Sequence, residues 1–169
     1  VVSRGCFAVI NRERRQQFLA RMAESVWDVL LLYGHSWRKD YFRSLVNFNF
    51  FGPHAVAALD RSGETSILVS HPWDEEILRG SAIPNVQCAG DFKRGLTALR
   101  SKFKSAKFAI AGVELMEAHF VEEHDVSATN TIEALRRVKT SDEIEILRAA
   151  SRLADIGYQY FVDTIEVGM

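Results

Sequence analysis

The stretch from His35 to His54 is the part of this sequence best suited to binding chemistry, and it reads HSWRKDYFRSLVNFNFFGPH. It places six aromatic residues among two histidines and the cations Arg38, Lys39 and Arg43. Aromatic side chains can exclude water from a site, while an arginine or histidine can pair with a substrate carboxylate. The alternative, which the sequence favours for the group as a whole, is that most of these aromatics are ordinary core. The six are Trp37, Tyr41, Phe42, Phe48, Phe50 and Phe51.

Other catalytic chemistries find little support. Ser36 lacks the second glycine that a nucleophile elbow requires, and neither cysteine adjoins a histidine. His119 and His124 are five residues apart, which does not place them on one helical face as a metal-binding pair. The charged run 122–125 is typical of a solvated helix end. We therefore predict no catalytic residue and no metal ligand in this chain, and structural or surface roles for its histidines.

Composition indicates an ordinary globular protein. The 169 residues are 47% hydrophobic and 25% charged, with a formal net charge of −1. This balance argues against a general attraction to nucleic acid or acidic lipid, so the aromatic and basic stretch is not expected to bind nucleic acid. No apolar run approaches the length of a membrane helix, and no signal-peptide pattern is present. Cys6 and Cys88 are expected to be reduced thiols of a cytoplasmic protein.

The elements that must position these residues follow from periodicity. Asn11 should cap a surface helix, and the continuous apolar run Val29 to Tyr33 predicts a strand buried on both faces. The clearest hairpin pairs 54–60 with 65–70 around the turn 61–64. Strands alternating with helices then predict a three-layer α/β/α sandwich with a mixed sheet of five to six strands. The apolar face of the first helix is expected to hold Phe18, Leu19, Met22 and Val26. The remaining predicted helices are 72–80, 91–104, 115–123 and 132–138. The remaining predicted strands are 86–88, 107–112 and 126–128.

A long helix is predicted near the end of the sequence. Thr140 and Glu143 form a T-x-x-E capping box, and Gly168 is expected to stop the helix about six turns later. Its apolar face needs a partner, and the glycine turn is expected to lead into a further domain. The stripe consists of Leu147, Ala150, Ala154, Gly157 and Phe161, widened by Ile144, Leu153 and Tyr160.

Two segments resemble a known family. The run LRRVKTSDEIEILRAA from Leu135 to Ala150, closing in Val167-Gly168-Met169, resembles the segment that joins the two domains of creatinase, prolidase and aminopeptidase P. Family members usually read lR-x-iK-s-x-x-E-i-x-x-i-r-x-A and close in pGm, so that threonine replaces serine and valine replaces proline here. The run 43–48, RSLVNF, resembles the family segment r-Y-L-t-G-F. There Ser44 replaces an aromatic residue, and Asn47 replaces a glycine and is expected to allow a turn with positive φ.

The resemblance carries expectations of fold and function. Residues 1–130 would form the ribonuclease H-like N-terminal domain, and 131–169 the connecting helix and first helix of a truncated pita-bread catalytic domain. The chain would be the non-catalytic part of a metal-dependent Xaa-Pro dipeptidase or aminopeptidase P-like hydrolase, inactive alone, contributing to dimerisation and substrate enclosure. Two divalent ions (Mn, Co or Zn) would lie in the missing domain. A non-catalytic peptide-binding module and the N-terminal domain of a creatinase-like small-amide hydrolase remain alternatives.

The same resemblance gives a set of site residues. In related enzymes the loop after the segment 43–48 reaches the active site, sometimes that of the other subunit of a homodimer, and helps to enclose a small peptide substrate. By position this implicates Trp37, Arg38, Phe51 and His54 as substrate-contacting residues.

Overall fold

The computed structural model of the chain describes residues 9–81, 83 and 85–165. The chain divides into two compact units, Val1–Arg136 and Arg137–Met169. The domain boundary expected after residue 130 falls inside helix α5, Thr129–Arg137. The division into two domains at that residue stays a prediction.

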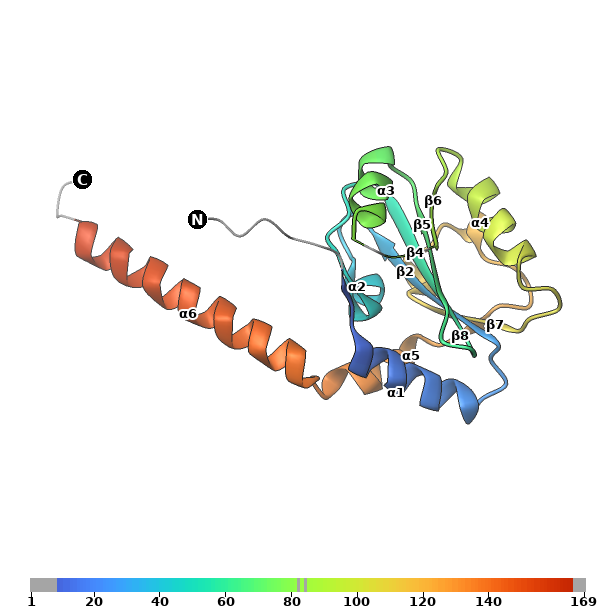
Figure 1. The fold of residues 1–169 in the computed structure, drawn as a ribbon, viewed down its shortest axis with the longest axis horizontal. Helices are drawn as coiled ribbons and strands as arrows, with labels where there is room; N and C mark the ends of the chain where they lie inside the picture. Colours follow the sequence, from blue (N-terminus) through green and yellow to red (C-terminus); the bar gives the residue numbers. More distant parts are fainter. Residues whose placement is uncertain (1–8, 82, 84, 166–169) are drawn as a thin grey trace. The chain divides into compact units, whose positions relative to one another are not determined.

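The first unit is built on a six-stranded mixed sheet (Figure 1). Its strand order is β6-β5-β4-β2-β7-β8, with β2 and β4 at the centre. A small second sheet pairs β1, Val9–Ile10, with β3, Val46–Asn47. The strands of the main sheet are β2 Val29–His35, β4 His54–Asp60, β5 Thr65–Val69, β6 Asn85–Cys88, β7 Phe108–Ala111 and β8 Val126–Ser127.

Strand direction follows from the connections. The predicted hairpin is confirmed: β4 pairs antiparallel with β5 and with β2, and His35 lies opposite His54 in the register. The other pairings in the main sheet, β2 with β7, β5 with β6 and β7 with β8, are parallel. Because β4 alone is reversed, the carboxyl ends of the other five strands and the amino end of β4 meet at one end of the sheet. We call this the carboxyl end of the sheet.

Helices cover both faces of the sheet, which confirms the three-layer sandwich (Figure 1). Alternate residues of β2 point to opposite sides. Leu30 and Leu32 join the core beneath α1, α2, α3 and α5, whereas Leu31 and Tyr33 join the core beneath α4. The helices are α1 Arg12–Ala23, α2 Asp40–Leu45, α3 Pro72–Arg79, α4 Phe92–Ser101 and α5 Thr129–Arg137.

Three local expectations were wrong. The helix predicted over 115–123 is two short 3-10 turns, Val113–Leu115 and Ala118–Phe120, because Met116 and Glu117 between them are extended. Val26 is exposed, because α1 has already ended at Ala23. Asn47 has no positive φ, because it lies in β3 opposite Val9, and Ser105 is the only non-glycine residue with positive φ in the described part of the chain.

The second unit contains the predicted long helix, α6, Ser141–Thr164. The capping box is confirmed: the Glu143 amide donates to the Thr140 hydroxyl, and the Thr140 amide donates to the Glu143 carboxylate at 2.9 Å. Gly168 lies outside the described residues. No α6 side chain is buried, and large apolar side chains such as Leu153, Ile156 and Phe161 are exposed. Among the described residues, no helix combines the length and apolarity needed to cross a membrane.

Candidate functional site at the carboxyl end of the sheet

The predicted site residues gather at the carboxyl end of the sheet, where α/β proteins commonly bind ligands. Strand β2 ends there at His35, and β4 begins beside it at His54. The loops leading out of β2 and into β4 are joined by a hydrogen bond from the Ser36 amide to the Pro53 carbonyl at 3.0 Å. Trp37 and Arg38 in the first loop and Phe51 in the second are therefore brought to one end of the sheet.

His54 is held inside a group of rings. Its Nδ1 lies 2.7 Å from the Tyr33 hydroxyl. The Phe92 ring lies 5.0 Å away between centroids and the Phe120 ring 5.3 Å away, so only 13% of the His54 side chain is exposed. Its Nε2 faces the Glu117 carboxylate at 3.7 Å. The imidazole thus has a partner at each of its two nitrogens and is mostly buried.

Burial shifts the titration of both partners in this pair. Desolvation lowers the pKa of His54, and the neighbouring His35 and His119 lower it further, while the Glu117 carboxylate acts in the opposite direction. Desolvation, and secondarily Glu117, raises the pKa of Tyr33 to about 12. Both groups are therefore neutral at pH 7. A neutral imidazole has one N–H donor and one acceptor nitrogen, and here Nδ1 is bonded to the Tyr33 hydroxyl while Nε2 faces the Glu117 carboxylate.

The side chains that cover His54 come from a segment fixed by a buried ion pair. Arg100 on α4 makes two hydrogen bonds of 2.7 Å to the Asp125 carboxylate, and both side chains are almost completely buried. The Arg100 guanidinium also donates to the Phe120 carbonyl at 3.4 Å. Glu117 and Phe120 thereby stay over the His54 ring. Sequence reasoning treated Asp125 as part of a solvated helix end and missed this pair, because the partner is 25 residues away.

Trp37 and Arg38 lie in the loop that follows β2. The Trp37 side chain is 89% exposed, which is unusual for an indole. Backbone hydrogen bonds in both directions between His35 and Arg38 close the turn, at 2.8 and 2.9 Å. The Arg38 guanidinium lies 3.5 Å from Asp40, with both side chains more than half exposed, so it is free to exchange that partner for another anion.

Phe51 is presented by a short loop fixed by Asp74. The Asp74 carboxylate is fully buried and accepts the Phe51 and Gly52 amides, each at 2.8 Å. The Phe51 ring is 68% exposed, as is the neighbouring Trp73 ring at 67%. Trp73 and Asp74 were not among the predicted site residues. Both occur in the first turn of a helix, where the sequence suggests only a favourable helix end.

The remaining aromatics of the stretch are core, which confirms the alternative interpretation for four of the six. Tyr41, Phe42, Phe48 and Phe50 are buried. The Phe42 and Phe50 rings meet edge to face at 5.1 Å, directly over Gly34. A Cβ at Gly34 would lie 2.9 Å from the Phe50 ring, so glycine is required for this packing.

Within the described residues, no group of three or more His, Cys, Asp or Glu side chains could hold a metal ion. His119 pairs with Glu117 at 3.4 Å. Cys88 is a half-buried free thiol, and burial raises its pKa, with Glu75 and Asp74 adding to the shift. Cys6 lies outside the described residues.

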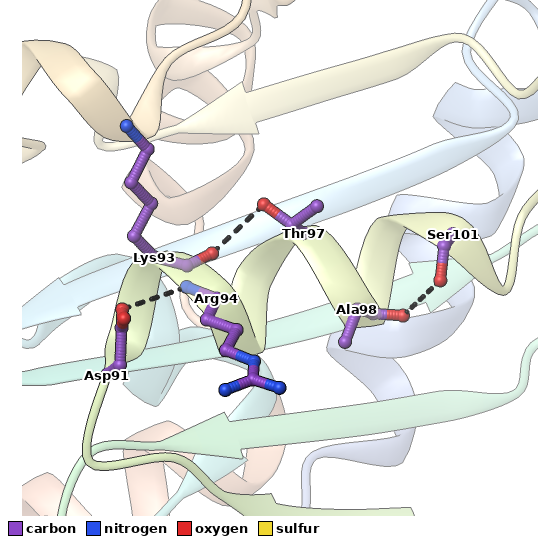
Figure 2. A pocket seen from close by; sticks show the side chains of 6 residues that line it. All are labelled: Asp91, Lys93, Arg94, Thr97, Ala98 and Ser101. Atoms are coloured by element: carbon purple, nitrogen blue, oxygen red, sulfur yellow. Dashed lines mark hydrogen bonds between the residues drawn. The ribbon is translucent and has the colours of Figure 1, made fainter.

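Two open hollows occur near α4, apart from the four predicted site residues. Figure 2 shows the first, of about 450 Å³, along the outer face of α4 between Asp91 and Ser101. The second, of about 540 Å³, lies between α3 and α4 at the end of β6. Trp37, Arg38, Phe51 and His54 line neither hollow. Their assignment as substrate-contacting residues stays a prediction.

The lowered pKa of His54 predicts a pH dependence of stability. Between the pKa of folded His54 and the ordinary value of 6.5, the unfolded chain binds a proton that the folded chain does not. The free energy of unfolding should therefore fall as the pH is lowered through this interval. Urea unfolding at several pH values measures the effect, and His54→Gln should reduce the slope. His124→Gln, at an exposed histidine, is the control. An unchanged slope in His54→Gln would contradict the prediction.

Comparison with solved structures supports the fold. No protein-family model matches the sequence, and no curated protein matches it. Among solved structures, the prolidase from Pyrococcus horikoshii OT3 is similar with a TM-score of 0.62 and 15% identity, over 94% of this chain and 44% of the prolidase chain. The prolidase from Pyrococcus furiosus gives a TM-score of 0.56 and 21% identity, over 89% of this chain and 43% of that one. The chain thus spans less than half the length of either prolidase, and its fold is that of the prolidases over a share that fits their N-terminal domain.

Proposed function

We propose that this chain acts as the non-catalytic N-terminal domain of a metal-dependent Xaa-Pro dipeptidase or aminopeptidase P-like hydrolase. The observation that carries the proposal is the match of 94% of this chain to 44% of a prolidase. The described residues supply no ligand set for a metal ion, so the two divalent ions of such a hydrolase (Mn, Co or Zn) would be bound by its catalytic domain. The N-terminal domain formed by this chain would supply packing and substrate contacts.

The substrate contacts would come from the carboxyl end of the sheet. Trp37 and Phe51 present exposed rings from two loops that are hydrogen-bonded to each other through Ser36 and Pro53. Exposed rings on fixed loops are suited to cover a small apolar ligand such as a proline ring and to exclude water from it. Arg38 adds a cation that can pair with the carboxylate of a peptide. His54 adds a neutral hydrogen-bonding group.

The exposed apolar side chains of the second unit favour packing against another protein segment. Helix α6 exposes an apolar stripe that includes Leu147, Leu153 and Phe161. Exposed apolar patches of this kind usually mark an interface. We propose that α6 packs as the first helix of the catalytic domain in the complete hydrolase, and that the complete hydrolase is a homodimer whose mass in solution is twice that of one chain.

One experiment tests the role in substrate enclosure. Glycyl-proline is added to the purified chain with Mn²⁺ at about 10 mM dipeptide, because a two-residue ligand binds weakly. NMR should show no release of free proline, while the indole signal of Trp37 shifts. The buried Trp27 serves as an internal control whose indole signal stays in place.

The two measurements test different parts of the proposal, and either can contradict its part without the other. Release of proline would show that the chain is catalytic by itself, against the proposal. A Trp37 signal that does not move, or that moves together with that of Trp27, would remove the assignment of this loop to the substrate while leaving the fold relationship intact.

A further inference from the structure

Strand β6 leaves one side of its backbone open. It is the last strand of the sheet and pairs only with β5, in parallel. The Ala89 amide continues this ladder by donating to the Val69 carbonyl at 3.0 Å. In a parallel ladder, alternate residues direct both backbone groups to the same neighbour. Gln87 and Ala89 therefore face β5, and the N–H and C=O of Cys88 face away from the sheet.

The last two residues of β6 line a groove. Residues 87–90 form one wall of the 540 Å³ hollow, with Glu75 and Arg79 of α3 and Arg94 of α4 on its flanks. Since α3 and α4 cover opposite faces of the sheet, the groove runs across the sheet edge between them. No turn, loop or side-chain hydrogen bond to the Cys88 backbone occurs among the described residues. Such an open edge is a template for a further strand.

Four charged side chains line the groove, Glu75, Arg79, Asp91 and Arg94. Glu75 and Arg79 pair with each other at 2.8 Å. The Asp91 carboxylate caps α4 by accepting the Arg94 amide at 3.0 Å. The Arg94 guanidinium has no hydrogen-bond or ion-pair partner among the described residues. Figure 2 shows the side chains of Lys93 and Arg94 leaving α4 in opposite directions, and of these two residues only Arg94 lines the groove.

We propose that the groove beside β6 binds an extended peptide with acidic side chains by β-strand addition. The peptide backbone pairs with the N–H and C=O of Cys88, and a peptide carboxylate pairs with Arg94. A second copy of this chain fits the groove less well. A four-residue strand buries little area for a stable dimer.

The test uses acetyl-Val-Glu-Val-Glu-Val-amide and the purified 169-residue chain, followed by NMR. The amide signals of Cys88 and Gly90 should shift, with a dissociation constant on the order of 0.1–1 mM for so short a peptide. The lysine analogue, acetyl-Val-Lys-Val-Lys-Val-amide, should bind at least about tenfold more weakly. Of two acidic peptides N-methylated at alternate amides, one should lose binding and the other keep it, because only one set faces β6.

Matched variants locate the carboxylate partner. Arg94→Glu should weaken binding of the acidic peptide about tenfold, whereas Lys93→Glu, with the same change of net charge on the neighbouring exposed residue, should change it less than about twofold. Circular dichroism confirms that both variants are folded. The proposal is overturned if the Cys88 signal does not move, if both methylated peptides still bind, or if the two variants weaken binding equally. A Cys88 signal that shifts with protein concentration alone would assign the groove to a second copy instead.

Discussion

Replacing Asp125 by alanine is expected to lower the free energy of unfolding by about 3–5 kcal/mol, because it leaves the buried Arg100 guanidinium without its main partner. The Arg100 side chain is 6% exposed and that of Asp125 3% exposed, so the guanidinium has little access to bulk water. Glu122 remains 3.2 Å from Arg100 but is mostly exposed, and it compensates only in part. Urea unfolding of the variant and the wild-type chain measures the difference.

Two control variants distinguish the loss of the ion pair from other effects of the substitution on stability. Glu123→Ala changes an exposed acid two residues away and should alter stability by less than about 0.5 kcal/mol. The double variant Arg100→Met with Asp125→Leu removes both charges and should lose much less stability than Asp125→Ala. A double variant as unstable as the single one would show that packing, and not an unpaired charge, is responsible.

The same substitution should also reach the candidate site. The ion pair holds the segment that carries Glu117 and Phe120 over His54. Loosening this segment admits water, and the pKa of His54 should move up towards 6.5 because desolvation is the main cause of its shift. An NMR titration of His54 measures the change. The candidate site therefore depends on contacts of α4 as well as on the loops after β2 and before β4.

The elements that could be predicted from sequence are those with strong local signals. The apolar run of β2, the hairpin of β4 and β5 and the capping box of α6 each depend on neighbouring residues, and each is confirmed. The 115–123 segment carries apolar residues at a spacing that also fits a helix. There, packing of Met116 and Phe120 into the core beneath α4 favours two 3-10 turns instead, which a local pattern does not contain.

The surroundings of His54 could not be predicted because they are assembled over long distances in the chain. Position in a family-like segment indicated His54, but its contacts come from Tyr33, Phe92, Glu117 and Phe120. No periodicity links these residues. The aromatic composition of the 35–54 stretch likewise did not distinguish the buried rings from the exposed ones. A ring is buried only if it faces the sheet, and the sequence of the stretch does not show which rings do.

Replacing Asp74 by alanine is expected to destabilise the chain by about 2–4 kcal/mol, because two backbone amides lose a charged, buried acceptor. The Phe51 and Gly52 amides both donate to this carboxylate. Gly52 permits the close approach, since a Cβ there would lie 2.7 Å from the Ser70 hydroxyl and 3.1 Å from Asp74 itself. The loop that presents Phe51 should therefore loosen, and amide exchange at Phe51 and Gly52 should become faster.

The controls for Asp74 distinguish the loop contact from a helix-end effect. Glu76→Ala removes an exposed acid from the same helix and should change stability by less than about 0.5 kcal/mol. Asp74→Asn keeps the shape but turns one acceptor into a donor, so it should also speed exchange at one of the two amides. If Asp74→Ala leaves both amides protected, the loop is held by its neighbours and the role assigned to Asp74 is wrong. If the amides open as expected, Phe51 owes its exposed position to a residue 23 positions away on α3.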